Sequence, residues 1–267
     1  MADKKQKKPR KQWNNRPKKQ AAGLNGLNPD EIVIYGIHAL KAALANEKRR
    51  FVKILTTRNA AERLSSQLEA RGLSVEIVEP EAISALTGPD GVHQGMAAIA
   101  RPLDTQDIYD VEHARLVIVL DQITDPHNVG AIMRSAVALG VDAIITTHRN
   151  APRESGLLAK TASGGLDHIN LVHVTNLAQA LTKLSDFGFV SIGLDSEGPK
   201  ALSDTLYGDK IALVLGAEGK GLRRLTRERC DALARLDMPG PIKSLNVSNA
   251  ATLATHQAAD YLKKKTS

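Results

Sequence analysis

The sequence has few of the residues that mark several common classes of protein. A single cysteine, Cys230, stands among 267 residues, which excludes an internal disulfide framework and a cysteine-based zinc site. The eight histidines lack ligand spacing, so no metal is expected. Aromatic residues make up only 3% of the chain, too few for a platform that stacks on nucleic-acid bases. No apolar run approaches the roughly 18 residues of a membrane-spanning helix, so we expect a soluble, cytoplasmic protein without a membrane partner.

Positive charge is concentrated near the start of the chain. Nine of the 36 basic residues and one of the 29 acidic residues lie in positions 1–20, a net charge of +8, whereas the rest carries −1. Such a segment buries too little apolar surface to fold, so residues 1–28 are predicted to be a disordered basic tail. Two interpretations stay open for it: a tether to phosphate backbones, or a solubilising tail.

Short strand and helix patterns alternate from position 29 to 101, which predicts a small α/β domain. A polar segment, 102–114, follows and is typical of a linker. The strands are expected at Ile32–Tyr35, Phe51–Thr56, Val75–Val78 and Met96–Ala100, and the helices at His38–Leu44, Ala60–Arg71 and Pro80–Leu86.

The remainder, 115–267, repeats the alternation with stronger signals. Leu116–Leu120 (LVIVL) and Ile211–Leu215 (IALVL) are continuous apolar runs, as parallel strands buried on both faces require. The fold class is therefore α/β with a mostly parallel sheet. Further strands are expected at Ala143–Thr147, Ile169–Val174, Phe189–Leu194 and Leu233–Met238, and helices at Asn128–Leu139, Leu157–Ser163, Leu177–Leu184, Leu222–Cys230 and Val247–Leu262.

Three segments that follow strands have unusual sequences: Asp121–Arg134, Gly216–Arg224 and Met238–Ala250. Open parallel sheets bind ligands beyond the carboxyl ends of their strands. In the second segment Gly216, Gly219 and Gly221 could expose backbone N–H groups to a ligand or could simply form a tight turn. The segment contains neither the GxGxxG fingerprint nor a Walker sequence.

The polar residues of the other two segments have structural as well as functional interpretations. Asn128 is suited to cap the helix that follows, and Arg134 could be a solvated surface residue. The third segment begins its helix with Ser244, Asn246, Ser248 and Asn249, which is more capping than one helix needs. Beside a glycine loop, these groups predict a dense hydrogen-bonding cup.

These segments resemble a known family. Asn128–Arg134 (NVGAIMR), Leu215–Leu222 (LGAEGKGL) and Ser244–Ala250 (SLNVSNA) resemble the three motifs of the SpoU (TrmH) family of RNA 2′-O-ribose methyltransferases, within the SPOUT superfamily. The resemblance covers roughly residues 115–262. Tyr35–His38 and His93–Gly95 extend it to the subgroup that methylates a guanosine in the peptidyl-tRNA-binding loop of 23S ribosomal RNA.

The resemblance implies properties that periodicity cannot show. It implies a SPOUT-type parallel sheet with a deep trefoil knot, although knots are nearly absent from proteins. It also implies a front domain that binds ribosomal RNA, a homodimer whose active site is completed at the interface, and S-adenosyl-L-methionine as cofactor. The cofactor contacts would fall at Gly216, Gly221, Leu236, Met238 and Leu245.

The resemblance also implies roles for the polar residues. Asn128 would orient Arg134 and the substrate ribose, and Glu218 would fix the loop, or Arg134 through an ion pair. Ser244 and Asn246 would shape the cup between donor and acceptor. Arg134 would act as the general base or, as is physically simpler, as a charged clamp on the adjacent phosphate.

Three other functions stay open at this point. The same chemistry on transfer RNA is the nearest, although the front domain resembles the ribosomal-RNA subgroup. A non-catalytic RNA-binding relative is the second, although Asn128, Arg134, Glu218 and Asn246 are all present. A Rossmann-type nucleotide enzyme is the third, and the missing GxGxxG after LVIVL disfavours it.

Overall fold

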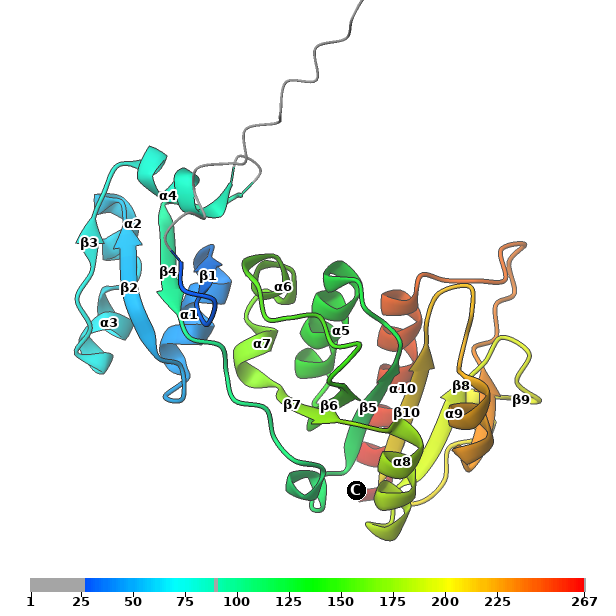
Figure 1. The fold of residues 1–267 in the computed structure, drawn as a ribbon. Coiled ribbons are helices and arrows are strands. Elements are labelled where there is room, and N and C mark those ends of the chain that lie inside the picture. Colours follow the sequence, from blue (N-terminus) through cyan, green and yellow to red (C-terminus); the bar gives the residue numbers. More distant parts are fainter. Residues whose placement is uncertain (1–26, 89–90, 267) are drawn as a thin grey trace, which may run out of the picture.

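A computed structural model describes residues 27–88 and 91–266, which form two β-sheets with their own helices (Figure 1). The smaller sheet precedes the larger one in the chain. Nearly all of the predicted basic tail lies outside the described residues. In the described part of the chain no helix is both long and apolar enough to cross a membrane.

The first sheet has four strands in the order β1-β4-β2-β3. Its central strand β4 is antiparallel to both neighbours, and β3 is parallel to β2. Apolar residues on one face contact α1, and those on the other, including Val33 and Leu55, pack around Ile83 of α4. The elements are β1 (Ile32–Tyr35), α1 (Ile37–Ala45), β2 (Phe51–Thr56), α2 (Arg58–Glu62), α3 (Ser65–Arg71), β3 (Glu76–Ile77), α4 (Pro80–Thr87) and β4 (Met96–Ala100).

The helix expected over Ala60–Arg71 is wrong as a single element. It breaks between α2 and α3, where the Ser65 hydroxyl donates to the carbonyl oxygen of Glu62 at 3.0 Å. Serine competes with backbone hydrogen bonding in this way, which favours a turn over a continuous helix. The end was predicted correctly, because Gly72 terminates α3 in the left-handed conformation.

The second sheet has seven strands in the order β7-β6-β5-β10-β8-β11-β9, and each neighbouring pair is parallel. The α/β class with a parallel sheet is therefore confirmed. The strands are β5 (Leu116–Asp121), β6 (Ala143–Thr147), β7 (Asn170–Val174), β8 (Val190–Leu194), β9 (Lys200–Ala201), β10 (Ile211–Gly216) and β11 (Ala232–Arg235). The helices are η1 (Ile108–Val111), α5 (Pro126–Ala138), α6 (Gly156–Ala162), α7 (Gly165–His168), α8 (Leu177–Asp186), η2 (Leu202–Asp204), α9 (Arg224–Arg229) and α10 (Val247–Thr266).

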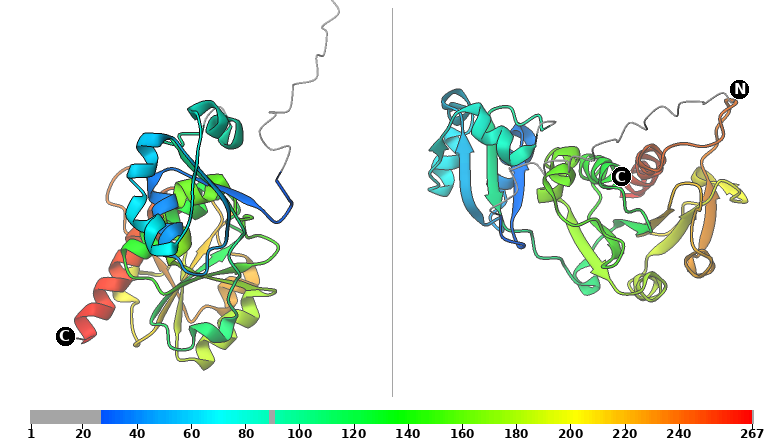
Figure 2. Two further views of the ribbon diagram at one scale, coloured as in Figure 1. Left: turned by 90° about the vertical axis from the view of Figure 1, so that its left-hand side faces the viewer. Right: turned by 45° about the horizontal axis from the view of Figure 1, so that its top comes forward.

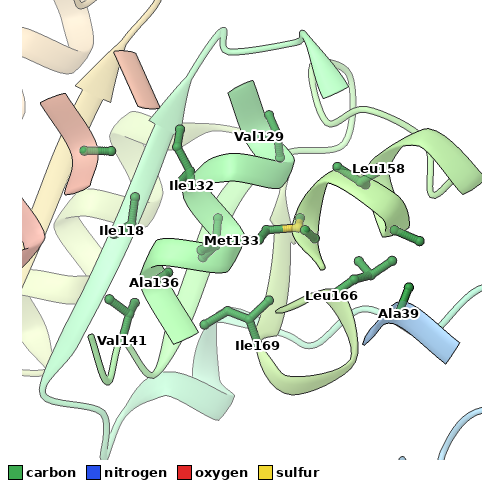
Figure 3. Packing of buried hydrophobic residues seen from close by; sticks show 14 of the residues in the cluster. Ala39, Ile118, Val129, Ile132, Met133, Ala136, Val141, Leu158, Leu166 and Ile169 are labelled. Atoms are coloured by element: carbon green, nitrogen blue, oxygen red, sulfur yellow. The ribbon is translucent and has the colours of Figure 1, made fainter. Parts of the chain in front are cut away.

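Helices cover both faces of this sheet. Every residue of β5 is buried, with Ile118 and Leu120 in the cluster that includes α5 and α10, and Val117 and Val119 in the cluster that includes α8. Figure 3 shows the first cluster, in which residues of α5 pack beside those of α6 and α7. Burial on both faces explains why the strand is a continuous apolar run.

The strand predicted at Leu233–Met238 is shorter than expected. β11 ends at Arg235, and Met238 lies in the loop before α10. The residues that follow are rich in proline and glycine, and Pro239 and Pro241 cannot donate to a strand ladder. Met238 therefore belongs to the loop between β11 and α10.

The two sheets are joined by close packing. One continuous cluster of buried residues runs from β1 and α1 into α5, α6 and α7, and Figure 3 shows Ala39 of α1 beside Leu166 of α7. Figure 2 shows the same two units from two further directions. The segment that connects the two sheets is also held against β7, since the backbone N–H of Gln106 donates to the carbonyl oxygen of Leu171 at 2.8 Å.

Candidate functional site

Three loops leave the carboxyl ends of strands β5, β10 and β11 at one edge of the larger sheet (Figure 1). The first joins β5 to α5, the second joins β10 to α9, and the third joins β11 to α10. β5 and β10 are neighbours, with Gly216 paired to Asp121 at their ends. The topology therefore brings together the three segments that the sequence singles out.

The glycine loop after β10 is a tight turn that excludes side chains. A Cβ atom on Gly216 would lie 2.1 Å from the carbonyl carbon of Gly221, so no larger residue fits there. Gly219 and Gly221 have positive φ angles of 74° and 64°. The Gly221 amide donates to the carbonyl of Ala217 at 2.8 Å and closes the turn.

An ion pair between a buried aspartate and a partly exposed arginine anchors the far end of this loop. The side chain of Asp121 is fully buried at the end of β5, and its Oδ1 accepts from Nε of Arg223 at 2.6 Å. Its Oδ2 accepts from the backbone N–H of Arg223 at 3.0 Å. Sequence reasoning did not assign this pair to the site, although an acid that ends a five-residue apolar strand was the available signal.

A hydrogen-bond network connects all three loops. The Asn246 side-chain amide donates to Oδ1 of Asn128 at 2.9 Å and to Oε1 of Glu218 at 2.6 Å. Oε1 of Glu218 also accepts from the backbone N–H of Val247, the first residue of α10, at 3.1 Å. The positive end of the dipole of α10 stabilises a carboxylate at this position. Glu218 thus fixes the glycine loop to the start of α10.

Asn128 does not cap its helix, so that interpretation is wrong. α5 begins two residues earlier, at Pro126, and Asp125 is the capping residue because its side chain accepts from the amide of His127 at 3.0 Å. Proline at the first helical position is favourable because its missing N–H is not needed there. The Asn128 side chain is left available to contact Asn246.

The residues before α10 form an exposed, partly apolar loop. Ser244 is exposed, while the Asn246 Oδ1 atom accepts from the Ser248 amide at 2.9 Å and from its hydroxyl at 2.6 Å. Leu245 is 38% exposed and Ile242 73% exposed. Backbone N–H groups from 238 to 245 donate no hydrogen bond to any residue that the structure describes. Leu236 is partly buried and packs against the main core.

Arg134 lies apart from this network. It is exposed on α5 and lines a groove of about 390 Å³ together with His38 and Lys41 of α1 and His168 of α7. The expected ion pair with Glu218 does not form within the described chain, because the Glu218 carboxylate bonds to Asn246 and Val247 instead. The structure therefore brings Asn128, Glu218 and Asn246 together but not Arg134.

The one cysteine is unsuited to nucleophilic chemistry. Burial raises the pKa of the Cys230 thiol to about 12, and the nearby carboxylates of Asp231 and Asp121 add to the shift. The reactive form of cysteine is the thiolate, which is scarce at neutral pH for such a group. Among residues 27–88 and 91–266 there is also no cluster of three or more His, Cys, Asp or Glu side chains placed to hold a metal ion.

Comparison with known families gives two matches that together span most of the chain. The pattern of the SpoU rRNA Methylase family matches residues 115–256, and that of the RNA 2′-O ribose methyltransferase substrate-binding family matches residues 33–106. The first covers the seven-stranded sheet up to α10, and the second covers nearly all of the four-stranded sheet.

Similar proteins match most of the chain. The 23S rRNA (guanosine-2′-O-)-methyltransferase RlmB of Yersinia pestis is 37% identical over 82% of this chain and 92% of its own. RlmB of Escherichia coli K12 is 34% identical over 85% of this chain and 97% of its own.

Solved structures share the fold. The SpoU methyltransferase AviRb from Streptomyces viridochromogenes, crystallised with AdoMet, aligns with a TM-score of 0.73 at 22% identity, over 87% of this chain and 90% of its own. The match of the methylase pattern to more than half of the residues, with relatives above 30% identity over most of the chain, settles the relationship: the chain belongs to the SpoU rRNA methylase family.

Proposed function

We propose that this protein transfers the methyl group of S-adenosylmethionine to the ribose 2′-oxygen of a guanosine in 23S ribosomal RNA, in the cytoplasm. The observation that carries the proposal is the network in which Asn246 contacts both Asn128 and Glu218, because it unites one residue from each family motif. Family membership and the names of the RlmB relatives support the reaction and the substrate.

The residues of the three loops fit such a cofactor. A nucleoside with an amino-acid tail needs backbone donors and acceptors beside an apolar wall. The N–H groups between Met238 and Leu245, which have no acceptor among the described residues, supply donors, and the exposed side chains of Leu245 and Ile242 supply apolar surface. Gly216 allows the tight turn, and Gly221 has open space where a side chain would lie, which leaves room for a ligand beside the backbone. Leu236, which is partly buried, lies in the loop between β11 and α10.

The cofactor supplies an electrophilic methyl group on a sulfonium. The protein's own residues then have to hold the ribose hydroxyl in line with it, and positioning of this kind can contribute about 7–11 kcal/mol. Asn128 presents its side-chain NH2 group to the acceptor sugar, and Asn246, whose own amide bonds to Asn128, Glu218 and Ser248, holds Asn128 in place. Ser244, exposed two residues away, can donate or accept at the hydroxyl.

Arg134 is assigned to the acceptor side of the reaction. A guanidinium stays protonated in proteins, so a charged clamp on the phosphate beside the target ribose is favoured over a general base. Because Arg134 does not reach the network of its own chain, we propose a homodimer in which Arg134 of a second copy completes the site.

The finer architecture belongs to the same proposal. We infer a deep trefoil knot in residues 115–267, supported by a chain that runs out to β11 and returns as α10 to pack against α5 and β10. Residues 29–101 would form the RNA-binding domain, as the substrate-binding match supports, and residues 102–114 would form the linker. The basic tail, 1–28, would add affinity for RNA phosphates.

Methyl transfer in solution tests the proposal. Purified full-length protein is incubated with labelled S-adenosylmethionine and in vitro transcribed 23S rRNA, with transfer RNA in a parallel reaction, and the nucleosides are identified after digestion. We expect label in 2′-O-methylguanosine from 23S rRNA alone. Label in transfer RNA would favour the alternative substrate, and cofactor binding without transfer to either RNA would favour a non-catalytic relative.

A further inference from the structure

The groove that contains Arg134 lies between the two sheets of the molecule. Its volume is about 390 Å³, and it is bordered by α1 of the first sheet and by α5, α6 and α7 of the second. Its polar rim consists of His38 and Lys41 from α1, Arg134 from α5, and His168 from α7. The remainder of the lining is formed mainly by alanine and glycine residues, among them Ala42, Gly164 and Gly165.

The charges in this groove all have one sign. No aspartate or glutamate lines it, and neither Lys41 nor Arg134 forms an ion pair with any residue that the structure describes. Holding like charges together without a counter-ion is unfavourable, and an anion between them relieves the repulsion. The two imidazoles add N–H donors. The groove is therefore suited to an oxyanion that accepts several hydrogen bonds.

A neighbouring, larger cleft shows the contrast. It has a volume of about 680 Å³ and is lined by Lys48, Arg50 and Arg101 together with acidic residues that include Asp104 and Asp110. Those carboxylates repel a polyanion and neutralise the basic side chains locally. Its larger size alone would make this cleft the better candidate for binding RNA. The purely basic lining of the smaller groove makes the groove the better candidate for a phosphate.

Close packing gives the groove a defined shape. A Cβ atom on Gly164 would lie 2.9 Å from Cβ of Ala42 and 3.2 Å from the carbonyl oxygen of His38, so α1 rests directly on the backbone before α7. A Cβ atom on Gly165 would lie 3.1 Å from the backbone nitrogen of Arg134. The helices that carry the basic residues are thus in backbone-to-backbone contact, and their spacing is fixed.

An ion pair holds the same two units together below the groove. Nε of Arg49, which follows α1, donates to Oδ1 of Asp167 in α7 at 2.8 Å, and the Asn46 side-chain amide donates to the same oxygen at 3.1 Å. The Arg49 side chain is fully buried. This contact fixes α1 against α7 and so keeps Lys41 close to His168.

We propose that the groove binds a phosphodiester group of the substrate RNA next to the ribose that is methylated, with Lys41 as its main ligand on the first sheet. The inference rests on the proposed function, because that function places Arg134 of one copy beside the acceptor ribose that is bound at the three loops of the other copy. It adds that α1 forms part of the acceptor site, so the first sheet contributes to positioning the target nucleotide as well as to general RNA affinity.

Salt-dependent RNA binding by full-length variants tests this inference. Binding to in vitro transcribed 23S rRNA is measured from about 50 to 200 mM salt for the wild type, Lys41→Ala, Lys41→Arg and Lys200→Ala. Lys200 is the matched control, an exposed lysine on β9 at the opposite edge of the larger sheet. Cofactor affinity and Tm are recorded for each protein.

Loss of one phosphate contact has a defined signature. Lys41→Ala should weaken binding several-fold and reduce the slope of log affinity against log salt by about 0.7–0.9. Its KM for RNA should rise while kcat, cofactor affinity and Tm stay near those of the wild type. Lys41→Arg should restore most of the affinity, and Lys200→Ala should change none of these quantities.

The outcomes separate this inference from the proposed function. If the wild type methylates 23S rRNA but Lys41→Ala matches Lys200→Ala in salt slope and KM, the groove assignment is overturned and the activity stands. A fall in Tm that Lys41→Arg does not rescue would also overturn it, since it indicates a structural role. If Lys41→Ala selectively weakens RNA binding but the wild type transfers no methyl group, the groove remains an RNA-backbone site and the proposed activity fails.

Discussion

The side-chain amide of Asn246 donates to Oε1 of Glu218 at 2.6 Å, across 28 positions of sequence. The two residues lie in different loops, and the same carboxylate oxygen receives the backbone N–H of Val247 at the start of α10. Asn246 in turn reaches Asn128 on α5. One carboxylate therefore sets the relative position of all three motif segments.

Removing that carboxylate should loosen the site more than the fold. Glu218→Ala is expected to weaken S-adenosylmethionine binding at least about tenfold and to lower the free energy of unfolding by about 1 kcal/mol, the net value of such hydrogen bonds at an exposed position. Glu218→Gln keeps an acceptor oxygen and should retain most of the affinity. Titration calorimetry measures the cofactor affinity of both variants, and urea unfolding measures their stability. Equal affinity for the alanine variant and the wild type would contradict the role of Glu218.

A methyl group on Gly216 should disrupt the glycine loop. Its Cβ would lie 2.1 Å and 2.3 Å from the carbonyl carbon and oxygen of Gly221, so the turn has to open. We expect Gly216→Ala to abolish measurable cofactor binding in calorimetry. The control is Gly188→Ala, where φ is +84° but no atom lies within 4 Å, so only backbone strain of about 1 kcal/mol is expected. Cofactor binding by Gly216→Ala at wild-type affinity would show that the turn is not part of the site.

Arg134 should separate catalysis from cofactor binding. Arg134→Ala is expected to abolish methyl transfer and leave S-adenosylmethionine affinity nearly unchanged, because the side chain lies in the groove and not among the three loops that follow β5, β10 and β11. Arg134→Lys keeps the charge without the planar fork, so a partial loss is expected. Transfer of a labelled methyl group measures the activity, and titration calorimetry on the same preparations measures the cofactor affinity. If cofactor affinity collapses together with activity, the acceptor-side assignment is wrong.

Arg49 should be critical for stability. Its guanidinium contacts both Asp167 and Glu154, and Nη1 also donates to the carbonyl of Arg101 at 3.1 Å. Arg49→Met leaves the two buried carboxylates of Asp167 and Glu154 without a cationic partner, which should cost about 3–5 kcal/mol in urea unfolding. The exposed neighbour provides the control, since Arg50→Met should change stability by less than about 0.5 kcal/mol.

The cost of losing Arg49 should depend on pH. Burial already raises the pKa of Glu154 although Arg49 opposes the shift. Without the guanidinium that pKa rises further, and a folded-state pKa above the unfolded value adds stability at low pH that is lost as pH increases through it. Arg49→Met should therefore be less destabilised near about pH 5 than near about pH 8. A cost that stays constant between the two would contradict the buried-carboxylate explanation.

Cys230 should be unreactive in the folded protein. With its pKa raised to about 12, its thiolate fraction at pH 8 is about 10³-fold below that of a free cysteine. Iodoacetamide should accordingly label the native protein about 10³-fold more slowly than the urea-unfolded chain, and the native rate should rise about tenfold per pH unit while the fold persists. Similar rates for the native and unfolded protein would show that the thiol is accessible and unperturbed.

Local patterns predicted most elements of the fold. The apolar runs of β5 and β10 were identified within one residue, since burial on both faces of the sheet imposes that pattern directly on the sequence. The bounds of β2 were also predicted correctly, although its buried residues, Ile54 to Thr56, are consecutive. The four-residue helix α7 and the two-residue strand β9 were missed, because so short an element has no period to detect. Their positions depend on contacts from distant parts of the chain.

The site was predicted from motifs but not from geometry. The resemblance selected Asn128, Glu218 and Asn246, which lie together, and also Arg134, which faces a groove shared with α1. Asn128 and Arg134 are six residues apart on one helix, so they point in different directions, and only the packing of α6 and α7 decides what Arg134 meets. The Asp121–Arg223 pair was missed because it joins positions 102 residues apart.

A site-by-site map of ribose methylation in 23S rRNA, made from cells with and without this protein, tests the central claim most directly. If the three motif loops position a methyl donor against a nucleotide sugar, one guanosine should lose its 2′-O-methyl group in the deletion strain and regain it when the wild type is restored. The Arg134→Ala variant should fail to restore it. An unchanged 23S rRNA map in the deletion strain would contradict the account.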